Sequence, residues 1–132
     1  MKFVSITGFV TNGLISTAKF LPLSSRASSS AMKTEGNIST TKFYDKGVLM
    51  TITVWENKES MRKFYLGEEH RAAMRQTKAL GKYAKVYSYL TDDVPNKEKA
   101  IEIWRKEGRV VFGDPDPKYG DEIELDTSTS TE

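Results

Sequence analysis

Hydrophobic and polar positions divide the chain into two kinds of segment. Residues 3–11, 37–44, 48–55 and 83–91 are rich in β-branched and aromatic side chains, and the first and last alternate between two faces. Such runs predict β-strands. The middle two are separated only by Asp-Lys-Gly, a short connection that predicts a β-hairpin.

Helical spacing predicts the remaining elements. We expect helices at about 22–34, between Asn57 and Gly67, at about 68–79 and at 97–107. Asn57 is a favoured N-cap residue and Gly67 a favoured stop. Pro22 lies within an apolar stretch that extends from residue 14, and we expect it to open the first helix after a short turn.

The predicted order is β-α-β-β-α-β with an added C-terminal helix, which is an α+β, ferredoxin-like antiparallel sheet. Helices would cover one face of this sheet, and both faces carry apolar residues. We therefore expect a homodimer through the second sheet face, a dimeric α/β barrel. Residues 1–112 are expected to form this single domain and residues 113–132 an acidic, disordered tail.

Composition removes several classes of protein. The 132 residues include no cysteine and one histidine, which excludes disulfides, thiol catalysis and a multi-histidine metal site within one chain. No apolar run approaches twenty residues, so we expect no membrane partner. The first residues lack the continuous apolar stretch of a secretory signal, and we expect a cytoplasmic protein.

Charge is distributed unevenly. Residues 114–132 carry a net charge of −6 and the remainder +8. A basic body with an acidic tail fits nucleic-acid binding with self-inhibition, or a solvated surface with a disordered end. RNA-recognition modules share this strand order, but Val48, Met50 and Thr53 stand where they need aromatic residues. We therefore expect no nucleic-acid partner, and no effect on folding when residues 114–132 are deleted.

His70 is the one side chain whose ordinary pKa lies near neutrality. It shares a helical face with Ala73, Met74 and Thr77, whereas Arg71 lies on the opposite face. An inward imidazole could transfer a proton or orient a ligand. It could equally be a buried, hydrogen-bonded histidine with a packing role.

Tyrosines and threonines of the predicted strands form a second set of candidates. They could line a pocket for an aromatic or oxygenated molecule, or stack across strands on a half-polar sheet face. The set consists of Tyr44, Tyr87, Tyr89, Thr7, Thr40, Thr51 and Thr53. The sequence contains no glycine-rich nucleotide loop and no serine in a nucleophile motif.

The segment from residue 51 to residue 74 resembles a known family. Thr-Ile-Thr-Val-Trp-Glu at 51–56 is followed by Ser-Met-Arg at 60–62, Phe64, and His-Arg-Ala-Ala-Met at 70–74. This pattern resembles dimeric α+β barrel proteins of the antibiotic-biosynthesis-monooxygenase type, over roughly residues 2–91. The resemblance implies a substrate cavity between sheet and helices, and it includes small bacterial proteins of undetermined function.

The same resemblance assigns site residues. Haem-degrading relatives use a helix histidine, an aromatic residue and a strand asparagine, and alignment through Trp55 puts Met74, Phe64 and Thr7 at or near these positions. Two of the three depart from the pattern, so haem is disfavoured, and the cofactor is unknown. No metal ligands are assigned.

We expect a monooxygenase-like protein that acts on a small aromatic or hydrophobic compound. His70 would be the catalytic residue, Trp55 and Phe64 would pack on the substrate, Tyr87 would orient it, and Thr7 and Met74 would complete the substrate-binding set. The alternative is a non-catalytic small-molecule-binding or interaction protein on the same scaffold.

Overall fold

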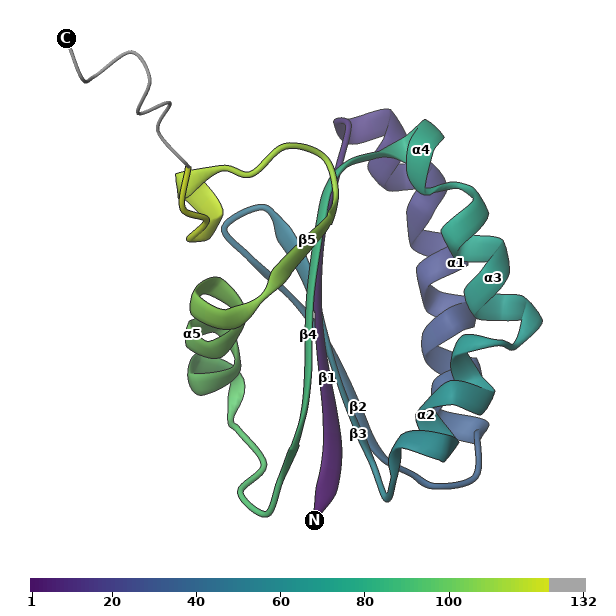
Figure 1. The fold of residues 1–132 in the computed structure, drawn as a ribbon. Coiled ribbons are helices and arrows are strands. Elements are labelled where there is room, and N and C mark those ends of the chain that lie inside the picture. The colour runs from purple at the N-terminus through teal and green to yellow at the C-terminus, as the bar shows by residue number, and fades with distance from the viewer. Residues whose placement is uncertain (124–132) are drawn as a thin grey trace, which may run out of the picture.

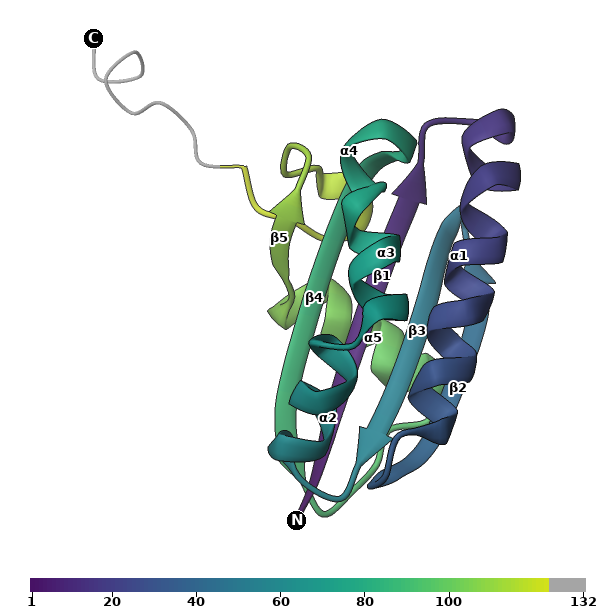
Figure 2. The same ribbon diagram turned by 90° about the vertical axis from the view of Figure 1, so that its right-hand side faces the viewer.

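The computed structural model describes residues 1–123 and contains one five-stranded antiparallel sheet in the order β2-β3-β1-β4-β5 (Figures 1 and 2). Its strands are β1 (Lys2–Thr11), β2 (Asn37–Asp45), β3 (Val48–Trp55), β4 (Gly81–Thr91) and β5 (Arg109–Phe112). The helices are α1 (Leu14–Lys33), α2 (Lys58–Tyr65), α3 (Glu68–Arg75), α4 (Thr77–Leu80) and α5 (Lys97–Glu107), with a 3-10 turn η1 (Pro117–Tyr119). The α+β, ferredoxin-like order and the added helix are confirmed, and the sheet is not closed within one chain.

The sheet has a helix layer on each side. Helices α1 to α4 cover one face, and α5 lies against the other (Figure 1). Alternation along β1 divides its side chains between them. Ser5 and Thr7 point toward α1 to α4, whereas Val4 and Ile6 are fully buried in the core cluster that contains Trp104 of α5.

Helix α5 corrects the expectation that the second face lacks cover within the chain. Ala100 is fully buried and Trp104 is 2% exposed. The Trp104 indole N–H donates to the Lys85 carbonyl at 2.7 Å, which anchors the helix to β4. The centre of the second face is therefore filled by the chain's own helix and is closed to a partner.

Gly8 is a point of close approach between sheet and α5. A side-chain carbon at this position would collide with the six-membered ring of Trp104. The ring is rigid and buried, so Gly8→Ala is expected to lower the free energy of unfolding by about 1–3 kcal/mol. Urea unfolding of Gly8→Ala measures this effect, and an unchanged free energy of unfolding would contradict the packing argument.

Helix α1 begins eight residues earlier than predicted, at Leu14. Pro22 lies inside the helix on its exposed side. Proline removes one backbone hydrogen bond, but the carbonyl of Ala18 that loses its partner belongs to an exposed residue and can bind water. A proline on the solvent side therefore does not end the helix.

The C-terminal segment also differs from prediction, because residues 109–123 pack on the domain. Strand β5 pairs with β4, and Tyr119 is 5% exposed. Asp121 accepts a hydrogen bond from the buried Lys85 ammonium at 2.7 Å and another from the Tyr83 hydroxyl. The expected disorder is wrong for residues 113–123, and residues 124–132 lie outside the described range.

Candidate functional site

A cavity of about 350 Å³ lies between the sheet and helices α1 to α3. An apolar cluster closes each end. Phe9, Phe20 and Leu49 belong to the cluster near α4, and Ala31 and Phe64 belong to the cluster near α2. Such an apolar cavity with few polar groups is typical of a small-molecule site.

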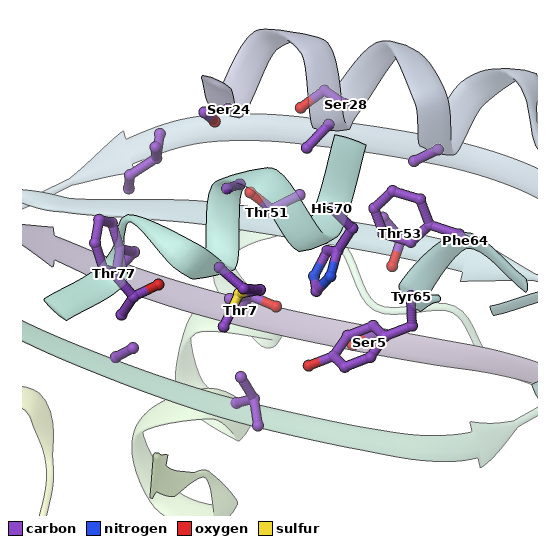
Figure 3. A pocket seen from close by; sticks show the side chains of 18 of the residues that line it. Ser5, Thr7, Ser24, Ser28, Thr51, Thr53, Phe64, Tyr65, His70 and Thr77 are labelled. Carbon is purple, nitrogen blue, oxygen red and sulfur yellow. The ribbon is translucent and has the colours of Figure 1, made fainter. Parts of the chain in front are cut away.

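Hydroxyl groups form a band across the floor between the two apolar ends (Figure 3). Ser5 of β1 stands opposite Thr53 of β3, and Thr7 stands opposite Thr51. The band continues into β2, where Thr40 pairs with Thr53. Because each hydroxyl can donate and accept, this floor suits a ligand that carries oxygen near the middle of an apolar body.

His70 enters the cavity from α3. Its ring lies 4.1 Å from the Tyr65 ring and meets the Phe64 ring edge-on at 5.0 Å, measured between centroids. Burial lowers the pKa of His70 below its ordinary value, and an interaction with the Tyr65 backbone carbonyl offsets part of this effect. The imidazole is therefore neutral at pH 7 and able to accept a proton.

The rest of the α3 face agrees with the helical spacing. Ala73, Met74 and Thr77 line the cavity with His70, and Arg71 is exposed. Lys78 departs from the expected solvent side and also lines the cavity. Lys78 belongs to α4, which Gln76 separates from α3, so the helical spacing of α3 does not extend to it.

Trp55 supports the cavity without lining it. The side chain is fully buried and stacks on Phe64 with ring centroids 5.6 Å apart. Its indole nitrogen finds no hydrogen-bond partner within residues 1–123. The structure places Phe64, and not Trp55, in the cavity lining, which differs from the prediction that Trp55 itself packs on the substrate.

Tyr87 lies on the other side of the sheet. It pairs with Ile6, whose side chain belongs to the core beneath α5, and it stacks on Tyr89 at 5.4 Å. The strand alternation is as predicted, but Val86 is the β4 residue that faces the cavity. Tyr87 cannot orient a substrate there. Tyr44 and Tyr89 also lie outside the cavity lining.

Several lining residues, with Ser24, Ser28 and Tyr65 among them, were not among the predicted site residues. Ser24 and Ser28 belong to the serine cluster of α1, and Tyr65 follows Phe64 in α2. The two serines are four positions apart on the face that also carries Phe20 and Ala31. This spacing was the available signal, but Phe20, which marks the buried face, lies before the predicted helix start at residue 22.

The cavity does not reproduce the pattern of haem-degrading relatives. Met74, which takes the place of the iron-binding histidine, is 46% exposed, and His70 lies one turn earlier. No cluster of three His, Asp or Glu residues able to hold a metal ion occurs within residues 1–123.

Solved structures with the same fold share little sequence with this chain. SnoaB from Streptomyces nogalater, described as a cofactor-independent oxygenase, is 13% identical with a TM-score of 0.59, over 73% of this chain and 98% of its own. Rv0793 from Mycobacterium tuberculosis is 11% identical with a TM-score of 0.65, over 73% and 100%. A protein described as an antibiotic biosynthesis monooxygenase is 17% identical with a TM-score of 0.58, over 72% and 100%. These similarities establish the fold, and they confirm the predicted resemblance at that level.

Sequence comparison identifies the family. Curated proteins give no match. A family profile described as a domain of unknown function matches residues 25–90, which is half of the chain and spans most of the cavity-lining residues. The chain therefore belongs to the DUF3291 family of domains of unknown function.

Proposed function

We propose that this protein is a monooxygenase-like enzyme that acts on a small, electron-rich aromatic compound bound between sheet and helices. The observation that carries the proposal is the position of the His70 imidazole at a largely apolar cavity floored by hydroxyl groups. Burial lowers the pKa of His70, which agrees with a proton-accepting role. The likeness in fold to SnoaB, described as a cofactor-independent oxygenase, supports the choice of reaction.

The cavity suggests how a phenolic substrate would bind. Its ring would lie between Phe64 and the apolar end near Phe9, with its oxygen above the hydroxyls of Thr7 and Thr51. His70 would accept the phenolic proton, because a neutral imidazole is the base available at this cavity at pH 7. The resulting phenolate is a much stronger electron donor than the phenol.

The oxygenation balances without an added reductant when the substrate carries an activated methylene group. The phenolate donates electrons to O₂, one oxygen atom replaces the two methylene hydrogens as a carbonyl, and the other leaves as water. The substrate supplies all four electrons. In this scheme the protein binds the ring, removes the proton and excludes bulk water.

Oxygen uptake with a hydroxylated anthrone tests this function. We expect catalysed uptake of one O₂ per anthrone and incorporation of label from ¹⁸O₂ into the new carbonyl. Ala73→Trp, which fills the cavity from α3, is expected to abolish turnover, whereas Ala79→Trp on the exposed side of α4 is the matched control. Equal uptake by both variants would contradict catalysis in the cavity.

One observation favours a non-catalytic binding protein as the second candidate. Among residues 1–123, no carboxylate lines the cavity, so the His70 imidazole has no acidic residue to orient it as in a catalytic dyad. Native mass spectrometry of protein from its own host distinguishes the two functions. A retained aromatic ligand that is released unchanged under O₂ would favour binding alone.

We also propose a homodimer through the part of the second sheet face beside α5. Tyr87 and Tyr89 are stacked and half-buried there, and burial raises the pKa of Tyr89. We expect a dimer in sedimentation experiments at micromolar concentration, and Tyr89→Asp should shift it toward monomer. Tyr44→Asp, at an exposed tyrosine outside this pair, is the control. A wild-type monomer would contradict the proposal.

A further inference from the structure

The first two turns of α1 present their apolar side to solvent. Leu14 is 87% exposed, Ile15 is 74% exposed and Leu21 is 40% exposed. The opposite side buries Phe20 but also the polar Ser24. A helix packed on a soluble domain normally shows the reverse arrangement. An exposed aliphatic cluster of this kind marks an interaction surface.

This cluster is held in a fixed position at one end of the molecule. The Asn12 backbone N–H donates to the Leu80 carbonyl at 2.9 Å, and the Asn12 side chain donates to the Gly81 carbonyl at 2.9 Å. These bonds tie the start of α1 to α4 and β4, and both views place the start of α1 at the same end of the molecule as α4 (Figures 1 and 2). The aliphatic side chains therefore project from a rigid support.

The surroundings of the cluster are positively charged. Neither α1 nor α4 contains an aspartate or glutamate, whereas Lys19 of α1, Lys78 of α4 and Lys82 directly after α4 are exposed. Helix α1 has no acidic residue in its first turn, and Gly13 offers no side-chain cap. The free N–H groups there add partial positive charge. The acidic segment near η1 lies on the other side of the sheet (Figure 1).

We propose that the start of α1 is a membrane-docking surface for bilayers with anionic headgroups. Leu14, Ile15 and Leu21 enter the interfacial layer, and the flanking lysines contact lipid phosphates. A second copy of this chain would bring Lys19 and an uncapped helix end against like charges, which favours the lipid surface. The helices within residues 1–123 are too short or too polar to span a membrane, and docking at the surface requires no span.

Vesicle binding tests the aliphatic contribution. We expect the protein to float with vesicles of 70% phosphatidylcholine and 30% phosphatidylglycerol, and to bind pure phosphatidylcholine at least tenfold more weakly. The double variant L14Q/I15Q should lose at least tenfold in binding to the anionic vesicles. Leu66→Gln, at a leucine that is 65% exposed after α2, should bind as the wild type does. Because all three side chains are exposed, thermal unfolding should be unchanged.

A charge variant tests the electrostatic contribution. Lys19→Gln should weaken binding to the anionic vesicles by about fivefold, the value for one lysine near a charged membrane. Lys63→Gln, on the exposed side of α2, is the control with the same charge change. High salt should reduce the difference between Lys19→Gln and the wild type, because it screens the lipid charge.

Two outcomes would overturn the proposal. The first is no binding to the anionic vesicles, or binding that L14Q/I15Q leaves intact. The second is self-association of the wild type that L14Q/I15Q abolishes in the absence of lipid, which would assign the cluster to an interface between copies of this chain.

Discussion

Replacing Asp121 by asparagine is expected to lower the free energy of unfolding by about 3–5 kcal/mol, the usual cost of breaking a buried ion pair. The Lys85 side chain is 1% exposed and Asp121 is 6% exposed. The Lys85 ammonium also donates to the carbonyls of Arg105 and Tyr119, at 2.8 and 3.0 Å. Those carbonyls solvate the ammonium but leave its charge without a counterion once Asp121 is neutral.

Denaturant unfolding of three variants isolates this ion pair. Glu122→Gln, at the exposed neighbouring residue, is the charge-matched control and should be nearly silent. The double variant K85M/D121N should be less destabilised than D121N, because it removes the stranded ammonium. If D121N unfolds like the wild type, the C-terminal segment does not dock through this pair. Deletion of residues 114–132 should destabilise the domain for the same reason.

The pH dependence of the Asp121 effect has a definite sign. Burial by itself would raise the pKa of Asp121, but hydrogen bonds from Lys85, Tyr83 and the Asp116 amide outweigh it and lower this pKa. A lowered folded-state pKa stabilises the fold above the unfolded value of about 4, and this contribution is lost as the pH falls through the folded value. The difference between wild type and D121N should be constant near pH 7 and shrink below about pH 4.

Local patterns were sufficient to predict most of the sheet. The hairpin of β2 and β3, the alternation in β1 and β4, and the inward face of α3 depend on residues close together in sequence. His70 could be placed at the cavity because exposed Arg71 marks the opposite side of the same helix. These features follow from a period of two or of 3.6 residues.

Alternation alone could not decide which face of a strand meets which helix. Tyr87 and Val86 alternate as predicted, but the choice of face depends on α5, which joins β4 through Trp104 and Lys85. The packing of Asp121 depends on Lys85, 36 residues earlier in the chain. Contacts between residues so far apart in sequence leave no periodic pattern. The composition of the C-terminal segment by itself is typical of a disordered tail.

His70→Gln is expected to reduce turnover of an anthrone substrate by about a hundredfold or more, because it removes the proposed general base and retains a polar side chain. The variant should remain folded, and Arg71→Gln on the exposed side of α3 is the matched control. A variant that melts early while turnover per folded molecule survives would assign His70 a packing role.

The pH profile separates the proton-transfer role of His70 from a structural one. Burial lowers the pKa of His70, so the neutral, proton-accepting form persists below the ordinary value of about 6.5. Wild-type turnover should therefore stay level down to about pH 6.5 and fall on further acidification, a decline that His70→Gln should lack.

The free energy of unfolding should also decrease as the pH falls. The unfolded chain binds the proton more readily than the folded protein does, so the contribution of His70 is complete above the unfolded pKa and decreases as the pH falls below it. A wild-type profile identical in shape to that of His70→Gln would show that the proton is accepted elsewhere.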